Sequence, residues 1–343
     1  MQTRIYHKAD GRTLWLYGRE PHTLPAQEEG EPAPEPHSHL RWHPVREEWV
    51  MYAAHRQGRT FLPPPDHCPL CPARPGGFPG EIPFADYEIA VFENRFPTLS
   101  RNPGPVPELP AVKAAPGTGR CEVVVYTSDH QGSMATLSTE RRELLLQVWA
   151  QRFHDLYADP TIAAILPFEN RGVEVGVTLH HPHGQIYAYP FVPPVLERES
   201  AAFSKRSWIE DLTPRLGDYL VAQAETALAF VPPFARYPYE VWIAPRVRKP
   251  LPTDLNPTEL SDLATLLGEV TGRYDRLFGR PMPYIMVLHA APRGDPTFHL
   301  HLEFYPVLRA PGKLKYLAGT EVGAGSFAAD VLPEQAAEQL RQL

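Results

Sequence analysis

The stretch HPHGQI, residues 181–186, carries the strongest signal in the sequence. On an extended strand, residues i, i+2 and i+4 project from one face, so His181, His183 and Gln185 are expected to point together. The proline and the glycine between them favour a strand entrance where a ligand approaches the backbone. A neutral imidazole has a free lone pair near pH 7, which suits a covalent phosphoryl or nucleotidyl intermediate. The alternative is two ordinary histidines near a loop.

Runs of β-branched and aromatic residues around this motif predict strands. In the first part of the chain they cover residues 48–54, 88–92, 121–126, 162–168, 173–177 and 185–189, and later they cover 240–244, 284–289 and 298–304. Two long helices are also expected, over 138–158 with Ser138 as the N-cap and over 257–278 with Asn256 as the N-cap.

The order of these elements repeats. The strand at 121–126 precedes its His-x-His pair by nearly the same number of residues as the strand at 240–244 precedes the pair His299 and His301. We therefore expect an α+β fold of two duplicated units, residues 1–195 and 196–343, with helices packed on an antiparallel sheet. The alternative is a chance recurrence of strand–helix–strand order.

Composition excludes several classes of protein. The formal net charge of the 343 residues is -7, so no basic excess points to nucleic acid. We also find no apolar run long enough for a membrane helix and no signal peptide at the charged N-terminus. The three cysteines include the close pair Cys68 and Cys71, which argues for a metal ligand pair and a reducing cytoplasm. Cys121 is expected in the core.

A resemblance to a known family follows from longer motifs. The run FENRG at 168–172, followed by HHPHGQIYA at 180–188, resembles galactose-1-phosphate uridylyltransferases, a family of the histidine-triad superfold. Further matches are Glu48-Trp49-Val50, His55-Arg56, Cys68-Pro69-Leu70-Cys71-Pro72, Asn94, Phe96-Pro97, Ser128-Asp129-His130, Leu288-His289-Ala290-Ala291-Pro292 and the stretch 299–306. The resemblance therefore extends over most of the chain.

The resemblance implies a two-step transfer of UMP. His183 matches the nucleophile that takes UMP from UDP-glucose, and galactose 1-phosphate then accepts it to give UDP-galactose. Gln185 matches the amide that hydrogen-bonds the phosphoryl oxygens, and a neutral amide at this position favours transfer over hydrolysis. The implied substrate-binding residues are Arg56, Arg59, Asn94, Asn170, Thr178, Lys315 and Glu321. The family also forms homodimers with active sites shared between subunits.

Two metal sites are implied in the same way. His130 and His181 match the ligands that complete a zinc site with Cys68 and Cys71, for which the alternative is a pair of buried free thiols. A second site for iron or zinc matches Glu199, His289, His299 and His301, for which the alternative is a structural histidine cluster. His299 and His301 are expected to share a strand face.

Three other functions remain open from the residues alone. A related nucleotidyltransferase or phosphorylase would keep His183 but act on ADP-sugars or dinucleoside polyphosphates. A zinc-stabilised binding module would dispense with His183. A metallohydrolase is less consistent with the motifs, because the cysteine-containing site has no open position and the histidine-rich site lacks a general base.

Overall fold

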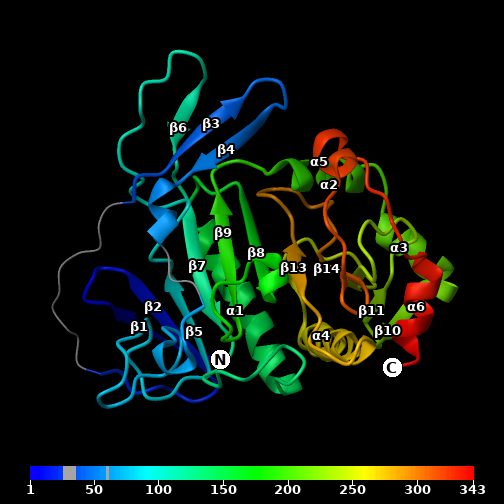
Figure 1. Ribbon diagram of the computed structural model, residues 1–343, viewed down its shortest axis with the longest axis horizontal. Coiled ribbons are helices and arrows are strands. Elements are labelled where there is room, and N and C mark those ends of the chain that lie inside the picture. The colour runs from blue at the N-terminus through cyan, green and yellow to red at the C-terminus, as the bar shows by residue number, and fades with distance from the viewer. Residues whose placement is uncertain (26–35, 59–61) are drawn as a thin grey trace.

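One sheet of 11 strands runs through both halves of the protein in the computed structural model, which describes residues 1–25, 36–58 and 62–343 (Figure 1). Its strands are β1 (Gln2–His7), β2 (Thr13–Gly18), β5 (Ile89–Glu93), β7 (Arg120–Val125), β8 (Ala164–Arg171), β9 (His183–Tyr189), β10 (Leu220–Gln223), β11 (Ala227–Phe230), β12 (Val241–Pro245), β13 (Tyr284–His289) and β14 (His301–Pro306). Their order is β1-β2-β5-β7-β9-β8-β13-β14-β12-β11-β10, and all neighbours are antiparallel.

The order of the strands has an internal symmetry about the pair β8 and β13. Outward from this seam, one half reads β8-β9-β7-β5-β2 and the other reads β13-β14-β12-β11-β10. A long helix follows the third strand of each half, α1 (Thr139–Tyr157) after β7 and α4 (Pro257–Leu277) after β12. The predicted α+β fold of two duplicated units is therefore confirmed. The boundary between residues 195 and 196 stays a prediction, since the sheet is continuous.

The two long helices contact each other and share one core with the sheet. Side chains such as Leu145 of α1, Leu267 of α4 and Ile186 of β9 belong to this core. Both helices start as predicted. The Ser138 hydroxyl accepts from the amide of Arg141 at 3.2 Å, and the Asn256 side chain forms a capping box with Glu259.

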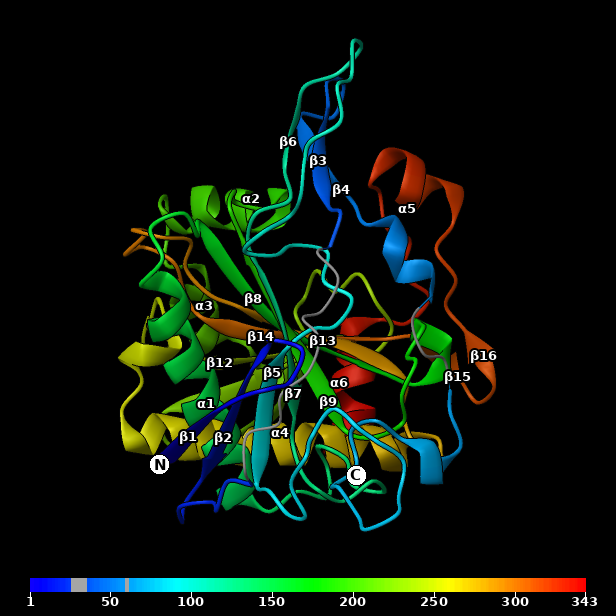
Figure 2. The ribbon, with the colours of Figure 1, turned by 90° about the vertical axis from the view of Figure 1, so that its left-hand side faces the viewer.

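Smaller elements surround this framework. A second sheet, in the order β4-β3-β6, projects from the main one (Figure 2). It contains β3 (His39–His43), β4 (Glu48–Tyr52) and β6 (Ala114–Pro116). The remaining elements include the pair β15 (Leu308–Ala310) and β16 (Lys313–Leu314) and the helices α2 (Pro194–Phe203), α3 (Trp208–Leu212), α5 (Gly319–Ala324) and α6 (Pro333–Arg341). In the part of the chain that is described, no helix combines the length and apolar character of a membrane span.

Two predicted strands differ in the structure. Residues 173–177 form a 3-10 turn at Val173–Val175, because Gly172 and Gly176 on either side adopt φ angles of 98° and 77° that no strand uses. The strand predicted at 298–304 starts later, at His301. The preceding Leu300 donates its amide to the carbonyl of Lys249 instead of joining the main ladder.

Candidate active site and metal centres

His183 stands at the start of β9 with one ring nitrogen fixed. Its Nδ1 lies 2.7 Å from the carbonyl oxygen of His181, and because a carbonyl can only accept, the proton sits on Nδ1. The lone pair is therefore on Nε2. Burial lowers the pKa of His183, which keeps the imidazole neutral and nucleophilic near pH 7.

Gly184 allows Tyr126 and Phe168 to approach β9 closely. A Cβ atom at this position would lie 2.1 Å from the Tyr126 hydroxyl oxygen and 2.7 Å from the carbonyl oxygen of Phe168. No side chain fits there, so the glycine of the motif is a packing requirement.

A cavity of about 500 Å³ lies in front of β9. Five of the predicted site residues line it together, namely Arg56, Asn94, Thr178, His183 and Gln185. Its size suits a small organic ligand.

Gln185 has its amide oriented by a neighbour. The Asn94 amide nitrogen donates to Gln185 Oε1 at 3.3 Å, and Asn94 Oδ1 in turn accepts from the amide of Phe96 at 2.9 Å. This chain of bonds leaves the Gln185 NH2 group for a ligand, which is the donor that a phosphoryl oxygen needs.

Arg56 is also held in place. Its Nη1 donates to the carbonyl of Phe96 and to the Thr98 hydroxyl, both at 2.9 Å, and to the Tyr187 hydroxyl at 3.2 Å. A guanidinium fixed through one nitrogen keeps its other donors for an oxyanion. Arg59, predicted beside it, lies outside the described residues.

Three predicted substrate contacts are not brought to this cavity. Asn170 lies on β8 opposite Ile285 and is absent from the described lining. Lys315 bonds to Glu321 and also donates to the carbonyl of Ala328 at 2.9 Å. Glu321 accepts from the amide of Ala318 at 2.6 Å at the start of α5. Within this chain, Lys315 and Glu321 thus bond each other and line no described cavity.

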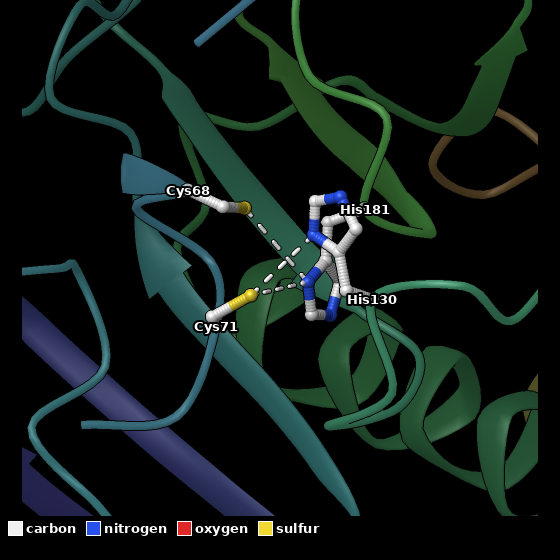
Figure 3. A group of neighbouring side chains, drawn as sticks. All are labelled: Cys68, Cys71, His130 and His181. Atoms are coloured by element: carbon white, nitrogen blue, oxygen red, sulfur yellow. Dashed lines mark hydrogen bonds between the residues drawn. The ribbon is translucent and has the colours of Figure 1, made fainter. Parts of the chain in front are cut away.

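The four residues of the first predicted metal site do meet (Figure 3). Cys71 Sγ lies 3.4 Å from Nδ1 of His130 and 3.5 Å from Nδ1 of His181, and Cys68 Sγ lies 3.9 Å from the same atom of His181. Two thiols and two imidazoles are a closed tetrahedral set for a divalent metal. Burial and the neighbouring Cys68 raise the pKa of Cys71 to about 12, so two thiolates need a cation between them.

This cluster is connected to His183. The Nε2 of His181 donates to the carbonyl of Thr127 at 2.7 Å, which directs Nδ1 toward the cysteines. The carbonyl of the same His181 accepts from His183. A metal held here would therefore fix the residue that orients the His183 ring.

Three of the four residues predicted for the second metal site meet, and Glu303 lies with them. The potential ligand atoms of Glu199, His289, His301 and Glu303 lie within 4.8 Å of one another, and this group does not include His299. His299 precedes β14, and its Nε2 donates to the carbonyl of Pro245 at 2.9 Å. Its buried Nδ1 has no partner among the described residues, so His299 stays a predicted ligand.

Glu303 is the functional candidate that the sequence reasoning missed. It follows His301 by two residues on β14, so the period of a strand places both on one face. That signal was available in the sequence. The closest pairs in the group are His289 Nδ1 with Glu199 Oε2 at 2.7 Å and His301 Nε2 with Glu303 Oε1 at 3.1 Å.

The duplicated sheet and this site define an enzyme of the nucleotidyltransferase class. Two family models match the chain. The model for the N-terminal domain of galactose-1-phosphate uridyl transferase matches residues 31–193, and the model for its C-terminal domain matches residues 209–343. The chain belongs to the galactose-1-phosphate uridylyltransferase family.

Individual relatives agree with this assignment. A galactose-1-phosphate uridylyltransferase of Thermotoga maritima is 38% identical over 318 residues, which cover 88% of this chain and 98% of the relative. One of Rattus norvegicus is 30% identical over 338 residues, covering 90% and 88%. A solved uridylyltransferase structure aligns with a TM-score of 0.77 at 33% identity over 89% of this chain and 97% of its own. An ADP-glucose phosphorylase of Arabidopsis thaliana, at 22% identity and a TM-score of 0.68 over 89% and 99%, shares the fold.

Proposed function

We propose that the protein transfers UMP from UDP-glucose to galactose 1-phosphate through a covalent intermediate on His183. The observation that carries this proposal is the fixed tautomer of His183, which presents the Nε2 lone pair at a cavity that Gln185 also lines. A nucleophile and a phosphoryl-binding amide in one pocket are what such a transfer requires.

In the first step, Nε2 of His183 attacks the α-phosphorus of UDP-glucose. A P–N bond forms, the P–O bond to glucose 1-phosphate breaks, and that sugar phosphate leaves with the electron pair. In the second step, a phosphate oxygen of galactose 1-phosphate attacks the same phosphorus and the P–N bond breaks. The His181 carbonyl holds the Nδ1 proton throughout and stabilises the positive charge on the substituted ring. Gln185 donates to the phosphoryl oxygens, and Arg56 offers further donors to the phosphates.

Lys315 and Glu321 fit this proposal if two copies of the chain associate. They lie on the segment around α5, which stands apart from the cavity and carries the exposed apolar residues Tyr316 (76%), Leu317 (55%) and Val322 (60%). Apolar side chains exposed together are typical of an interface. In a homodimer, this segment would reach the part of the partner's active site that binds the hexose of the substrate.

We further propose zinc for the first metal cluster and zinc or iron for the second. The two cysteines favour zinc, and a set of imidazoles and carboxylates suits either ion. A metal at the first cluster would be structural, since its four ligands leave no open position. This chain's own residues then do the chemistry.

Intact mass spectrometry tests the proposal. After mixing with UDP-glucose and no acceptor, the protein should gain the mass of one UMP, and His183→Gly should gain none. The exposed neighbour His180→Gly is the matched control and should still be labelled. Labelling with ADP-glucose or GDP-glucose in place of UDP-glucose tests the nucleotide specificity. An adduct in His183→Gly, or labelling by ADP-glucose in preference to UDP-glucose, would contradict the proposal.

A further inference from the structure

The N-terminal hairpin lies outside both regions matched by the family, which begin at residues 31 and 209. Strands β1 and β2 form the edge of the sheet, and β2 pairs with β5 in the register Leu14 with Phe92. This places the turn between β1 and β2 beside the end of β5, where the chain continues to Asn94. The turn lines the same cavity as His183 and Gln185.

The turn has a defined conformation. The amide of Lys8 donates to the carbonyl of Arg12, and the amide of Gly11 donates to the carbonyl of Lys8, both at 2.9 Å. Gly11 adopts a φ of 83°, which favours glycine. The turn is also bound to β5, because Arg12 Nη1 donates to the carbonyl of Glu93 at 3.0 Å and the amide of Thr13 donates to the Glu93 carboxylate at 2.8 Å.

Two cations and three carboxylates meet at this turn, since Asp10 and Glu81 join Glu93. Arg12 donates to Asp10 and Glu81 at 2.6 and 2.7 Å through Nη2, and Lys8 also bonds Glu81. The turn therefore has no excess of positive charge, which argues against a site that attracts phosphate by net charge.

Lys8 and Arg12 differ in the donors that they have left. Arg12 bonds through Nε and both Nη atoms to Asp10, Glu81 and the Glu93 carbonyl. The Lys8 ammonium has three N–H groups and, among the described residues, one hydrogen-bond partner. It also lies 5.3 Å from the centre of the Phe92 ring, which is another wall of the cavity.

The rest of this wall suits a flat ring. Leu70, Phe92 and Val123 are buried apolar residues that line the cavity with Lys8. Apolar side chains cover the faces of a base, and a hydrogen-bond donor at its edge distinguishes bases by the acceptor atoms that they present. Uracil presents two carbonyl oxygens as acceptors, whereas adenine presents no carbonyl oxygen and carries an amino group.

We infer that Lys8 is a specificity-determining residue that donates a hydrogen bond to a carbonyl oxygen of the uracil base. The β1–β2 turn thereby forms the base end of the nucleotide site. This inference rests on the proposed function, because it takes the cavity to be the site for the UMP part of UDP-glucose.

The test compares the two half-reactions of Lys8→Met. This change keeps the length of the side chain and leaves Glu81 paired with Arg12. We expect kcat/KM for UDP-glucose to fall roughly 10- to 100-fold, the range for a lost hydrogen bond to a charged group. The value for galactose 1-phosphate, which has a phosphate but no base, should stay unchanged.

Arg4→Met is the matched control. Arg4 is exposed on β1 of the same hairpin and is not part of the cavity lining, so both kcat/KM values should match the wild type. Lys8→Leu, which also lacks a hydrogen-bond donor, should show the same selective loss as Lys8→Met, and it serves as a second variant if the methionine change prevents folding. Thermal unfolding of each variant checks that the hairpin is retained.

Equal losses for UDP-glucose and galactose 1-phosphate would overturn the inference, since they would mean that Lys8 acts on phosphate or on the fold. An unchanged kcat/KM for UDP-glucose would overturn it too. Failure of the proposed function is a separate result, because it would appear in the wild type as the absence of a UMP adduct, before any variant is compared.

Discussion

His183 and His301 occupy equivalent positions in the two halves of the sheet. Each begins its strand, and each places Nδ1 2.7 Å from the carbonyl oxygen of the residue two positions earlier. The next residue on the same face differs, since it is Gln185 in one half and Glu303 in the other. His301 Nε2 lies 3.1 Å from Glu303, and Trp242 stacks on its ring with centroids 4.7 Å apart. The same imidazole geometry is therefore open to a cavity in one half and enclosed in the other.

The close approach at Gly184 gives the first prediction. Gly184→Ala should destabilise the protein by about 1–3 kcal/mol, because the new methyl group overlaps the Tyr126 hydroxyl and the Phe168 carbonyl. Relief of this overlap would displace β9 and with it His183, so UMP labelling should slow as well. Chemical denaturation and labelling rates measure both effects.

A second substitution should relieve part of the clash. Adding Tyr126→Phe removes the hydroxyl, so the double variant should recover some of the lost stability. Gly323→Ala is the control, because a Cβ atom at that helical glycine would have no neighbour within 4 Å and the change should be neutral or slightly stabilising. A Gly184→Ala protein as stable and as active as the wild type would show that β9 is not tightly packed there.

Glu169 predicts how stability depends on pH. Burial raises its pKa to about 7, and one of its oxygens has no partner among the described residues. Since the pKa is lower when the chain is unfolded, the folded state holds the proton more tightly, and stability falls as pH rises from about 4.5 to about 7. Glu169→Gln should remove this loss, so its stability relative to wild type should increase by up to about 3 kcal/mol between pH 5 and pH 8. Urea denaturation at both pH values measures the difference.

The control for this prediction is Glu225→Gln. Glu225 is exposed, so its replacement should leave the difference from wild type the same at pH 5 and pH 8. If the stability of Glu169→Gln also differs from that of wild type by the same amount at pH 5 and pH 8, the Glu169 carboxyl is not protonated in the folded protein.

Metal analysis distinguishes the two sets of ligands for the second site. Cys71→Ser should lose about one metal ion per chain from the first cluster, and His301→Ala about one from the second. His299→Ala should also lose about one ion from the second site, because the buried Nδ1 of His299 has no partner among the described residues, as a ligand atom requires. Activity should fall further in Cys71→Ser, since the first cluster holds His181, whose carbonyl orients the proposed nucleophile His183. Full metal content in His299→Ala together with loss of metal in Glu303→Ala would replace His299 by Glu303 in the ligand set.

Gln185 predicts a loss in the chemical step. Gln185→Ala should lower kcat roughly 10²- to 10³-fold, the cost of removing one donor from a developing charge. Asn94→Ala should have a smaller effect of the same kind, because it frees the Gln185 amide to rotate. Gln131→Ala, an exposed glutamine, is the control. An unchanged kcat in Gln185→Ala would remove this residue from the phosphoryl site.

Local signals in the sequence predicted local structure well. The caps Ser138 and Asn256 act on residues three positions away, so the helix starts could be identified from the sequence alone. The spacing of Cys68 and Cys71 indicated a metal pair for the same reason. The partners His130 and His181 came from the resemblance to a family, because no local rule connects residues that far apart.

Contacts between distant segments account for what was missed. Lys8 reaches Glu81 only because β1 and β2 fold against β5, and the charges of the two residues give no sign of the pairing in the sequence. His299 matched a metal ligand of the family and was expected to share a strand face with His301, but the strand begins only at His301. The true start at His301 depends on the pairing of β14 with β13 and β12, which a single strand does not encode.

The seam between β8 and β13 has a consequence for how such a protein can change over generations. Because the two strands pair, each half covers an edge whose peptide groups would otherwise be exposed. The copies are inherited as one polypeptide, always in equal number, and neither depends on meeting the other by diffusion. Mutations can therefore accumulate around the imidazole of one copy while selection preserves the other, provided that the seam itself keeps its register.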